Sequence, residues 1–190
     1  MSSVVKQHIN QAFPVSNEEY AQLEKKFGSL AHYAAWQLKR KNFKNNFIDD
    51  EEDVCQDLIM ALMDAASYYK RQVYIVKCIN VLHLYVTDSF TKKIIDGLAD
   101  LWLNKTKHGA GKQKFGPFQE DVLEKLVIKW VPLDDRPDKK APLIIDANFK
   151  VYCKQVMWNR QRNIGKKITR DKSIRASLVS LSEFDYLSSI

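Results

Sequence analysis

The sequence predicts an all-α protein, and three observations support this. Apolar residues recur at helical spacing along most of the chain, and acidic residues or a proline stand where several of these stretches begin. Two polar stretches separate them: 105–117 holds three glycines and 132–142 holds three prolines. Both are typical of exposed loops. The pattern therefore predicts helices joined by loops.

The first three expected elements lie before residue 87. A helix should run from Asn17 to about Lys41, because Glu18 and Glu19 favour a helix start and apolar residues follow at helical spacing. The acidic run 49–53 predicts the start of a second helix, which should end at about Tyr69. A third helix is expected over much of 73–86, although the β-branched residues there leave a strand open.

Three further helices are expected after residue 87, with the segment 143–146 short and extended. The first should run from near Asp88 to before Gly109. The next should begin with Pro117 at its first helical position and end at about Trp130. The last should begin near Asp146 or Asn148 and continue beyond Arg162. We expect residues 1–70 and 146–190 to form one helical core, with 71–145 as a helical insertion.

The composition is that of a soluble globular protein, with 190 residues of which 45% are hydrophobic and 28% charged. The N-terminal segment MSSVVKQHINQAF lacks the apolar stretch of a signal peptide. The most apolar run, 73–86, contains Lys77, Asn80 and His83 and is too short and too polar to span a bilayer. Three scattered cysteines without a C-x-x-C pair indicate a reducing compartment. We therefore expect a cytoplasmic protein without a membrane partner.

The positive charge is concentrated near the C-terminus. Residues 154–175 hold eight Lys or Arg against the single acidic Asp171, a balance that equals the formal net charge of +7 of the whole chain. Such a basic block usually marks a polyanionic partner, most often nucleic acid. A solvated basic helix without a partner is the alternative.

The second helix has the opposite character, because its only charges are carboxylates. Its expected core face consists of Val54, Leu58, Ala61, Leu62, Ala65 and Tyr69. The opposite face, which we call the acidic stripe, consists of Asp53, Gln56, Asp57, Met60, Met63 and Asp64. Exposed methionines beside fixed negative charge suggest a docking surface for a basic partner. An ordinary acidic surface with partly buried methionines remains the other interpretation.

The segment EDVCQDLIMALMDAASYY resembles conserved region 2.2 of the bacterial sigma factor family, whose pattern is E-D-L-x-Q-E-G-x-x-G-L-x-x-A-x-x-x-F. The matching positions are Glu52, Asp53, Gln56, Asp57, Leu62, Ala65 and Tyr69. In that family the helix binds a basic coiled coil of the largest RNA polymerase subunit. The resemblance implies that Asp53, Gln56, Asp57 and Met63 contact the core polymerase, with Met60 and Asp64 in the same stripe. Leu58 and Ala61 replace the family's small residues, and Asp64 stands at an often basic position.

A second block, 148–185, resembles regions 2.3 and 2.4 of the same family, in which Phe149, Tyr152, Asn159 and Asn163 match. Gln155 and Val156 replace the adjacent tryptophans of primary sigma factors, and Trp158 is the nearest substitute. The implied DNA-binding residues are Tyr152, Lys154, Trp158, Asn159, Arg160, Arg162, Asn163, Lys166, Lys167 and Arg170. Phe149 is expected in the core, whereas both a core and a stacking role stay open for Tyr152.

The resemblance implies a short, phage-type sigma factor whose partners are bacterial core RNA polymerase and promoter DNA, in the cytoplasm of a bacterial host. After 190 residues no room is expected for a domain that reads the −35 element, so a co-activator could replace it. No catalytic residue and no cofactor are expected.

Two alternatives stay open. One is a regulator that binds DNA or RNA without polymerase. The other is a metal-dependent nuclease, because RPDKK and IIDANFK faintly resemble carboxylate elements of such enzymes. The four histidines, His8, His32, His83 and His108, lack the spacing of a zinc site.

Overall fold

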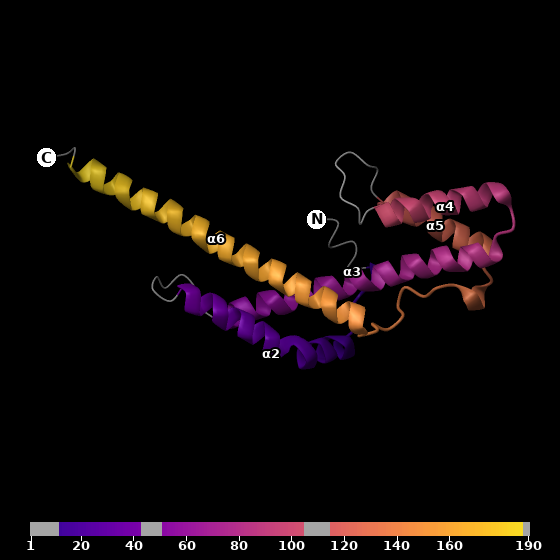
Figure 1. Ribbon diagram of the computed structural model, residues 1–190, viewed down its shortest axis with the longest axis horizontal. Coiled ribbons are helices and arrows are strands. Elements are labelled where there is room, and N and C mark those ends of the chain that lie inside the picture. Colours follow the sequence, from indigo (N-terminus) through magenta and orange to yellow (C-terminus); the bar gives the residue numbers. More distant parts are fainter. Residues whose placement is uncertain (1–11, 43–50, 105–114, 188–190) are drawn as a thin grey trace. The chain divides into compact units, whose positions relative to one another are not determined.

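The computed structural model describes residues 12–42, 51–104 and 115–187. This part of the chain forms five α-helices and a 3-10 turn, with no β-strand, which confirms the predicted all-α class. The elements are α2 (Asn17–Asn42), α3 (Glu51–Tyr85), α4 (Ser89–Asn104), α5 (Pro117–Trp130), η2 (Leu133–Asp135) and α6 (Ala147–Leu187) (Figure 1). None of the described helices is both long enough and apolar enough to cross a membrane.

The chain divides into two units. Unit 1 comprises Met1–Pro14 and Ser67–Pro142, and unit 2 comprises Val15–Ala66 and Leu143–Ile190. Unit 2 therefore contains α2, the first part of α3 and all of α6, whereas unit 1 contains the rest of α3 with α4, α5 and η2.

Side chains fix the starts of the helices where the sequence predicts them. The hydroxyl of Ser16 accepts a hydrogen bond from the Glu19 backbone N–H (3.2 Å), and the Glu19 carboxylate accepts one from the Ser16 N–H (2.8 Å). This reciprocal capping box satisfies two backbone donors at the start of α2. The buried Glu19 carboxylate also accepts a hydrogen bond from the backbone N–H of Leu143, which lies just before α6.

Aspartates cap the next predicted starts. Asp88 accepts from the Thr91 N–H at 2.7 Å at the start of α4, and hydrogen bonds from Thr91 lower the pKa of the Asp88 carboxyl. Asp146 accepts from the Phe149 N–H at 2.7 Å at the start of α6. The segment 143–146 before it is not helical, as expected.

One prediction about the helices is wrong. The second and third expected helices form the single helix α3, so neither the break between Tyr69 and Val73 nor the alternative strand over 73–86 exists. The two charged residues at the expected break are buried: Lys70 donates to the carbonyl oxygen of Pro14 (2.9 Å), and Arg71 binds Glu120. No glycine or proline occurs within Glu51–Tyr85, so nothing in the backbone interrupts the helix.

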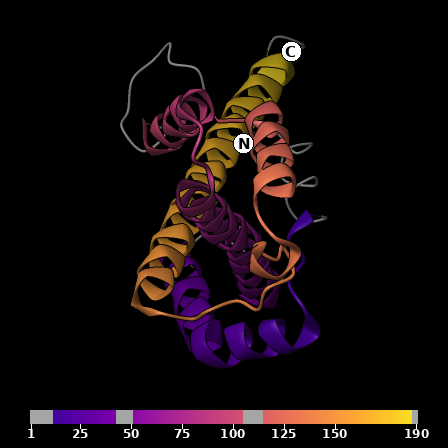
Figure 2. The same ribbon diagram turned by 90° about the vertical axis from the view of Figure 1, so that its right-hand side faces the viewer.

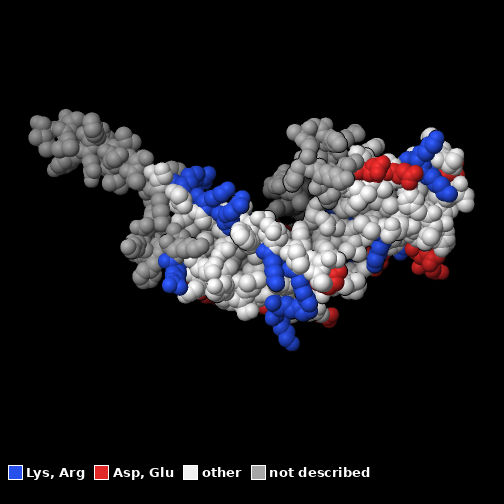
Figure 3. All heavy atoms as spheres, viewed as in Figure 1, with Lys and Arg blue, Asp and Glu red and all other residues white. Residues whose placement is uncertain are grey.

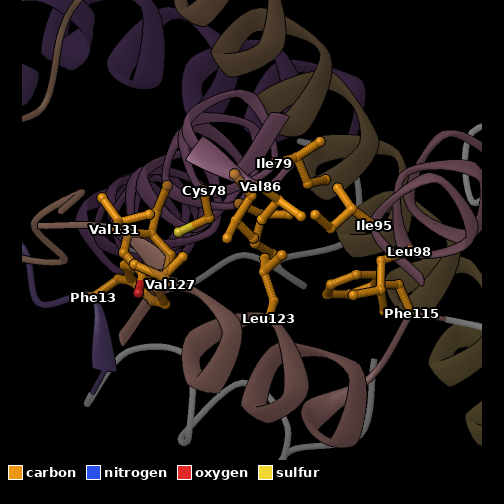
Figure 4. Packing of buried hydrophobic residues seen from close by; sticks show 13 residues of the cluster. Phe13, Cys78, Ile79, Val86, Ile95, Leu98, Phe115, Leu123, Val127 and Val131 are labelled. Carbon is orange, nitrogen blue, oxygen red and sulfur yellow. The ribbon is translucent and has the colours of Figure 1, made fainter. Parts of the chain in front are cut away.

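The core of unit 1 lies among α3, α4 and α5. Figure 2 looks along these helices, and Figure 4 shows the buried side chains that they bring together. Ile75, Cys78 and Leu82 of α3 lie in one cluster with Ile95 of α4 and Leu123 of α5. Phe13 and Phe115, both fully buried, complete it.

Candidate functional site

One face of α6 is buried in unit 2. Phe149, Cys153 and Met157, at four-residue spacing, are almost fully buried, and the ring of Phe149 meets the ring of Phe27 on α2 edge-on at 6.5 Å. The expected core role of Phe149 is thereby confirmed. Burial raises the pKa of the Cys153 thiol to about 12. Because α6 packs on this face, its opposite face is turned to solvent.

The solvent-facing side of α6 carries a row of cationic and aromatic side chains. Lys154, Trp158, Arg162 and Lys166 follow one another at four-residue intervals, and all four are exposed. Side chains at this spacing lie one above the other on a helix. We call these four residues the α6 row. Trp158, with 62% of its surface exposed, stands between Lys154 and Arg162.

The other exposed polar residues of α6 extend this face. Asn159, Asn163, Lys167 and Arg170 are also exposed, and Asn159 accepts a hydrogen bond from the Gln155 amide at 3.2 Å. On the side shown in Figure 3, basic side chains gather along α6. Within the described part of the chain, the three cations of the α6 row make no ion pair.

Tyr152 differs from Trp158 in its surroundings. It is half-buried and interacts with neighbouring residues, whereas Trp158 is open to solvent. Among the aromatic residues predicted to contact DNA, Trp158 is therefore the one whose ring faces are accessible to an unpaired base.

The acidic stripe of α3 is divided by the structure into two parts. Asp53, Gln56 and Met60 are exposed, and Met60 has 60% of its surface open. The half-buried members are Asp57, Met63 and Asp64. Asp53 makes no ion pair with any residue that the structure describes.

The expected core face of this part of α3 is only partly the buried one. Leu58, Leu62 and Ala65 are buried as predicted. The remaining predicted core residues, Val54, Ala61 and Tyr69, are half-buried, while Cys55 and Ala66, which the pattern did not single out, are buried. Burial and the nearby carboxylates of Glu51 and Glu52 raise the pKa of the Cys55 thiol.

The half-buried part of the acidic stripe contacts the basic helix. Arg160 of α6 donates two hydrogen bonds to the carboxylate of Asp57, from Nε to Oδ2 at 3.0 Å and from Nη2 to Oδ1. These hydrogen bonds, with the charge of Asp64 adding to them, raise the pKa of the Arg160 guanidinium. The sequence resemblance led us to expect Arg160 on a DNA-binding surface and Asp57 on a polymerase-binding surface, yet in the structure the two side chains bind each other.

Hydrogen bonds from Gln161 fix α6 against α2. The amide of Gln161 donates to the carbonyl oxygen of Ala34 at 3.0 Å and also to the side chain of Gln37 at 3.3 Å. Gln161 and Arg160 thus fix the rotation of α6 toward α2 and α3, and this rotation leaves the α6 row outward.

The outer face of α2, a helix that the sequence shows to be aromatic and basic, holds a surface whose residues were not among the predicted site residues. Tyr33 and Trp36 are exposed, and their rings stack with centroids 5.9 Å apart. The guanidinium of Arg40 lies over the Trp36 ring at 5.4 Å. The spacing of these residues, at i, i+3 and i+7, is a helix-face signal that could have revealed them.

Asp138 and Asp146 belong to the two segments that resemble nuclease elements, and each accepts a hydrogen bond from a nearby backbone N–H. Asp138 accepts a hydrogen bond from the Lys140 backbone N–H at 2.8 Å, and Asp146 caps α6. Arg136 donates to two carbonyl oxygens at the end of α5, those of Val131 (2.9 Å) and Ile128 (2.8 Å). Among the residues that the structure describes, no group of three or more His, Cys, Asp or Glu side chains is placed to hold a metal ion.

No protein-family model matches the chain, and no curated protein or solved structure matches it either.

Proposed function

We propose that the protein is a sigma-like transcription initiation factor. The acidic stripe would bind a basic surface of bacterial core RNA polymerase, and α6 would recognise and help to open a −10-type promoter element. Residues 1–70 and 146–190 would form the region 2-like domain, with 71–145 inserted into it. A separate co-activator would take the place of a domain that reads the −35 element.

The observation that carries the proposal is the α6 row. Lysine and arginine side chains can neutralise phosphates, and asparagines beside them can hydrogen-bond base edges. The exposed ring of Trp158 can stack on an unpaired base, which contributes about 1–3 kcal/mol per base. Charge, base-edge donors and a stacking face on one helix are what a protein needs in order to bind a partly opened duplex.

A second candidate function is a nucleic-acid-binding regulator that acts without polymerase. The ion pair between Asp57 and Arg160 favours it, because part of the acidic stripe is neutralised within the chain. Co-purification with bacterial core RNA polymerase separates the two functions. A protein that binds polymerase, and whose holoenzyme footprints at defined sites on the genome that encodes the chain, is a sigma-like factor. A protein that binds DNA but never polymerase is a regulator.

The first prediction concerns the polymerase contact. Replacing Asp53 and Asp57 together with lysine should sharply reduce co-purification with core polymerase, since like charges across an interface cost several kcal/mol. The amount of polymerase retained by a tagged protein at fixed salt measures this.

Because Asp57→Lys also breaks the ion pair with Arg160, the matched control is Arg160→Gln, which breaks the same pair and keeps both aspartates. That control should retain polymerase at least as well as the parent. Undiminished retention by the double lysine variant would show that the acidic stripe is not the contact surface.

The second prediction concerns opening of the promoter. Trp158→Ala should leave polymerase binding intact but reduce open-complex formation on duplex templates, because the exposed stacking face is removed. A template with a mismatched −10 region should restore activity, since the few kcal/mol needed to unstack the bases are then already supplied.

Permanganate reactivity of unpaired thymines on both templates reports this difference. Val151→Ala is the matched control, because Val151 is exposed seven residues earlier on the same helix face but has no ring that could stack on a base. Equal opening of the duplex by Trp158→Ala and by the parent would exclude Trp158 from the melting step.

A further inference from the structure

Among the residues that the structure describes, the outer face of α2 lies away from the helix face that packs in the core of unit 2. The buried face of this helix consists of Leu23, Phe27, Ala31, Ala34, Ala35 and Leu38. Tyr33 and Trp36 lie on the other side, with 54% and 43% of their surfaces exposed. Two large aromatic side chains are thus partly exposed at the surface, outside the buried core.

These two rings are ordered with respect to each other and to a cation. The planes of Tyr33 and Trp36 are inclined by only 25°, so the rings stack. Arg40 lies over the Trp36 ring, with its guanidinium carbon 5.4 Å from the centroid. Such a cation–π contact orders the indole and keeps a positive charge beside it.

The charge around these rings has one sign. From residue 25 to residue 40 the helix carries Lys25, Lys26, Lys39 and Arg40 and no acidic residue. Lys25 and Lys26 are exposed, and so is His32 beside the aromatic pair. Lys39 is the one that faces away, toward Glu51 at 3.8 Å. An anionic ligand is therefore complementary to this face.

We propose that the face formed by Tyr33, Trp36 and Arg40 binds an unpaired base of a single-stranded nucleic acid. Stacked rings offer a flat apolar surface to a base, and Arg40 with Lys26 can contact the phosphates on either side of it. A duplex is a poorer ligand, because its bases already stack on one another. This site goes beyond the proposed function, in which α6 alone binds nucleic acid, and an opened DNA strand or an RNA could both supply the base.

Binding of the full-length protein to fluorescent oligonucleotides of dT or rU, measured by anisotropy at low salt, tests the proposal. Trp36→Ala should weaken binding by roughly five- to a hundredfold, the range that alanine substitution of a base-stacking residue produces. Trp36→Phe should retain most of the affinity because it keeps a ring. Phe118→Ala is the matched control and should bind as the parent does, since Phe118 is an exposed aromatic residue of α5 in unit 1.

Two further measurements make the outcome specific. In the Trp158→Ala background, Trp36→Ala should still reduce binding, because the two rings lie on different helices. Photocross-linking of an oligonucleotide with 5-iodouridine should label the peptide that contains Tyr33 and Trp36. The dT and rU arms show whether the site prefers DNA or RNA.

Parent-like affinity of Trp36→Ala, with cross-links confined to α6, overturns the proposal. An equal loss of duplex and single-strand binding also overturns it, since stacking on a free base would then play no part. If Trp36→Ala keeps its oligonucleotide affinity but loses polymerase, the face is a protein contact instead. Because the oligonucleotide assay uses the free protein, failure of this site is distinguishable from failure of the polymerase assignment.

Discussion

Replacing Glu120 with glutamine is expected to lower the free energy of unfolding of unit 1 by about 3–5 kcal/mol. Glu120 of α5 and Arg71 of α3 form a buried pair, with Nε and Nη2 of Arg71 at 2.9 Å and 2.7 Å from the same carboxylate oxygen. Their side chains are only 10% and 6% exposed. Removing one charge leaves the guanidinium of Arg71 buried without a counter-charge, and desolvation of that ion is what costs stability.

Chemical denaturation, together with hydrogen exchange resolved by peptide, measures this loss and shows whether it is confined to unit 1. Glu124→Gln is the matched control on the same helix, because Glu124 pairs with Lys139 at 2.6 Å but is about one-third exposed. A partly exposed pair of this kind contributes about 0–1 kcal/mol. Equal effects of the two substitutions would show that the Arg71–Glu120 pair is not a buried one.

A double variant isolates the cause of the effect. Arg71→Met with Glu120→Leu removes both charges and keeps similar volumes, so most of the lost stability should return. If the double variant is as unstable as Glu120→Gln, the loss comes from packing and not from the unpaired charge.

Replacing Phe149 with alanine should lower the free energy of unfolding of unit 2 by about 3–5 kcal/mol, the cost of removing a buried aromatic ring and leaving a cavity. Phe149 is fully buried and packs edge-on against Phe27. Denaturation by urea measures the loss, and hydrogen exchange should locate it in α2 and α6. The matched control is Val151→Ala, two residues away with 68% of its surface exposed, which should change stability by less than about 0.5 kcal/mol. Comparable losses in the two variants would contradict the buried position of Phe149.

Signals that are local in the sequence were sufficient to predict most helix ends. The bounds Pro117–Trp130 agree with the prediction, and α2 begins at Asn17 as expected. Ends of this kind can be predicted because a capping side chain acts on backbone groups two or three residues away, as Asp88 does on Thr91. The acids Asp49 and Asp50, which helped to predict the second helix, and most of the loop 105–117 lie outside the described residues.

The absence of glycine and proline from Glu51–Tyr85 favours one continuous helix, but no local signal indicates that two adjacent charges in its middle are buried. Lys70 and Arg71 interrupt the apolar pattern, and adjacent charges usually indicate an exposed boundary. Their partners, Pro14 and Glu120, lie 56 and 49 residues away in the chain. Only the tertiary structure brings those partners close enough to make burial of the charges favourable.

The candidate site was predictable to a similar extent. The spacing of Lys154, Trp158, Arg162 and Lys166 already places them on one helix face, and the structure turns that face outward. The contact between Asp57 and Arg160 was not predictable, because 103 residues separate them.

That contact makes Arg160 a competitor tethered to the chain. Any basic partner that approaches Asp57 must displace a guanidinium whose effective concentration is set by the fold, so dilution of the protein does not remove it. Because both side chains are partly exposed, their pair contributes about 0–1 kcal/mol, which lowers the association constant of such a partner by up to about fivefold. That factor is the same for every ligand that must contact Asp57, whatever its affinity, whereas Asp53 and Met60 have no competitor of this kind among the described residues.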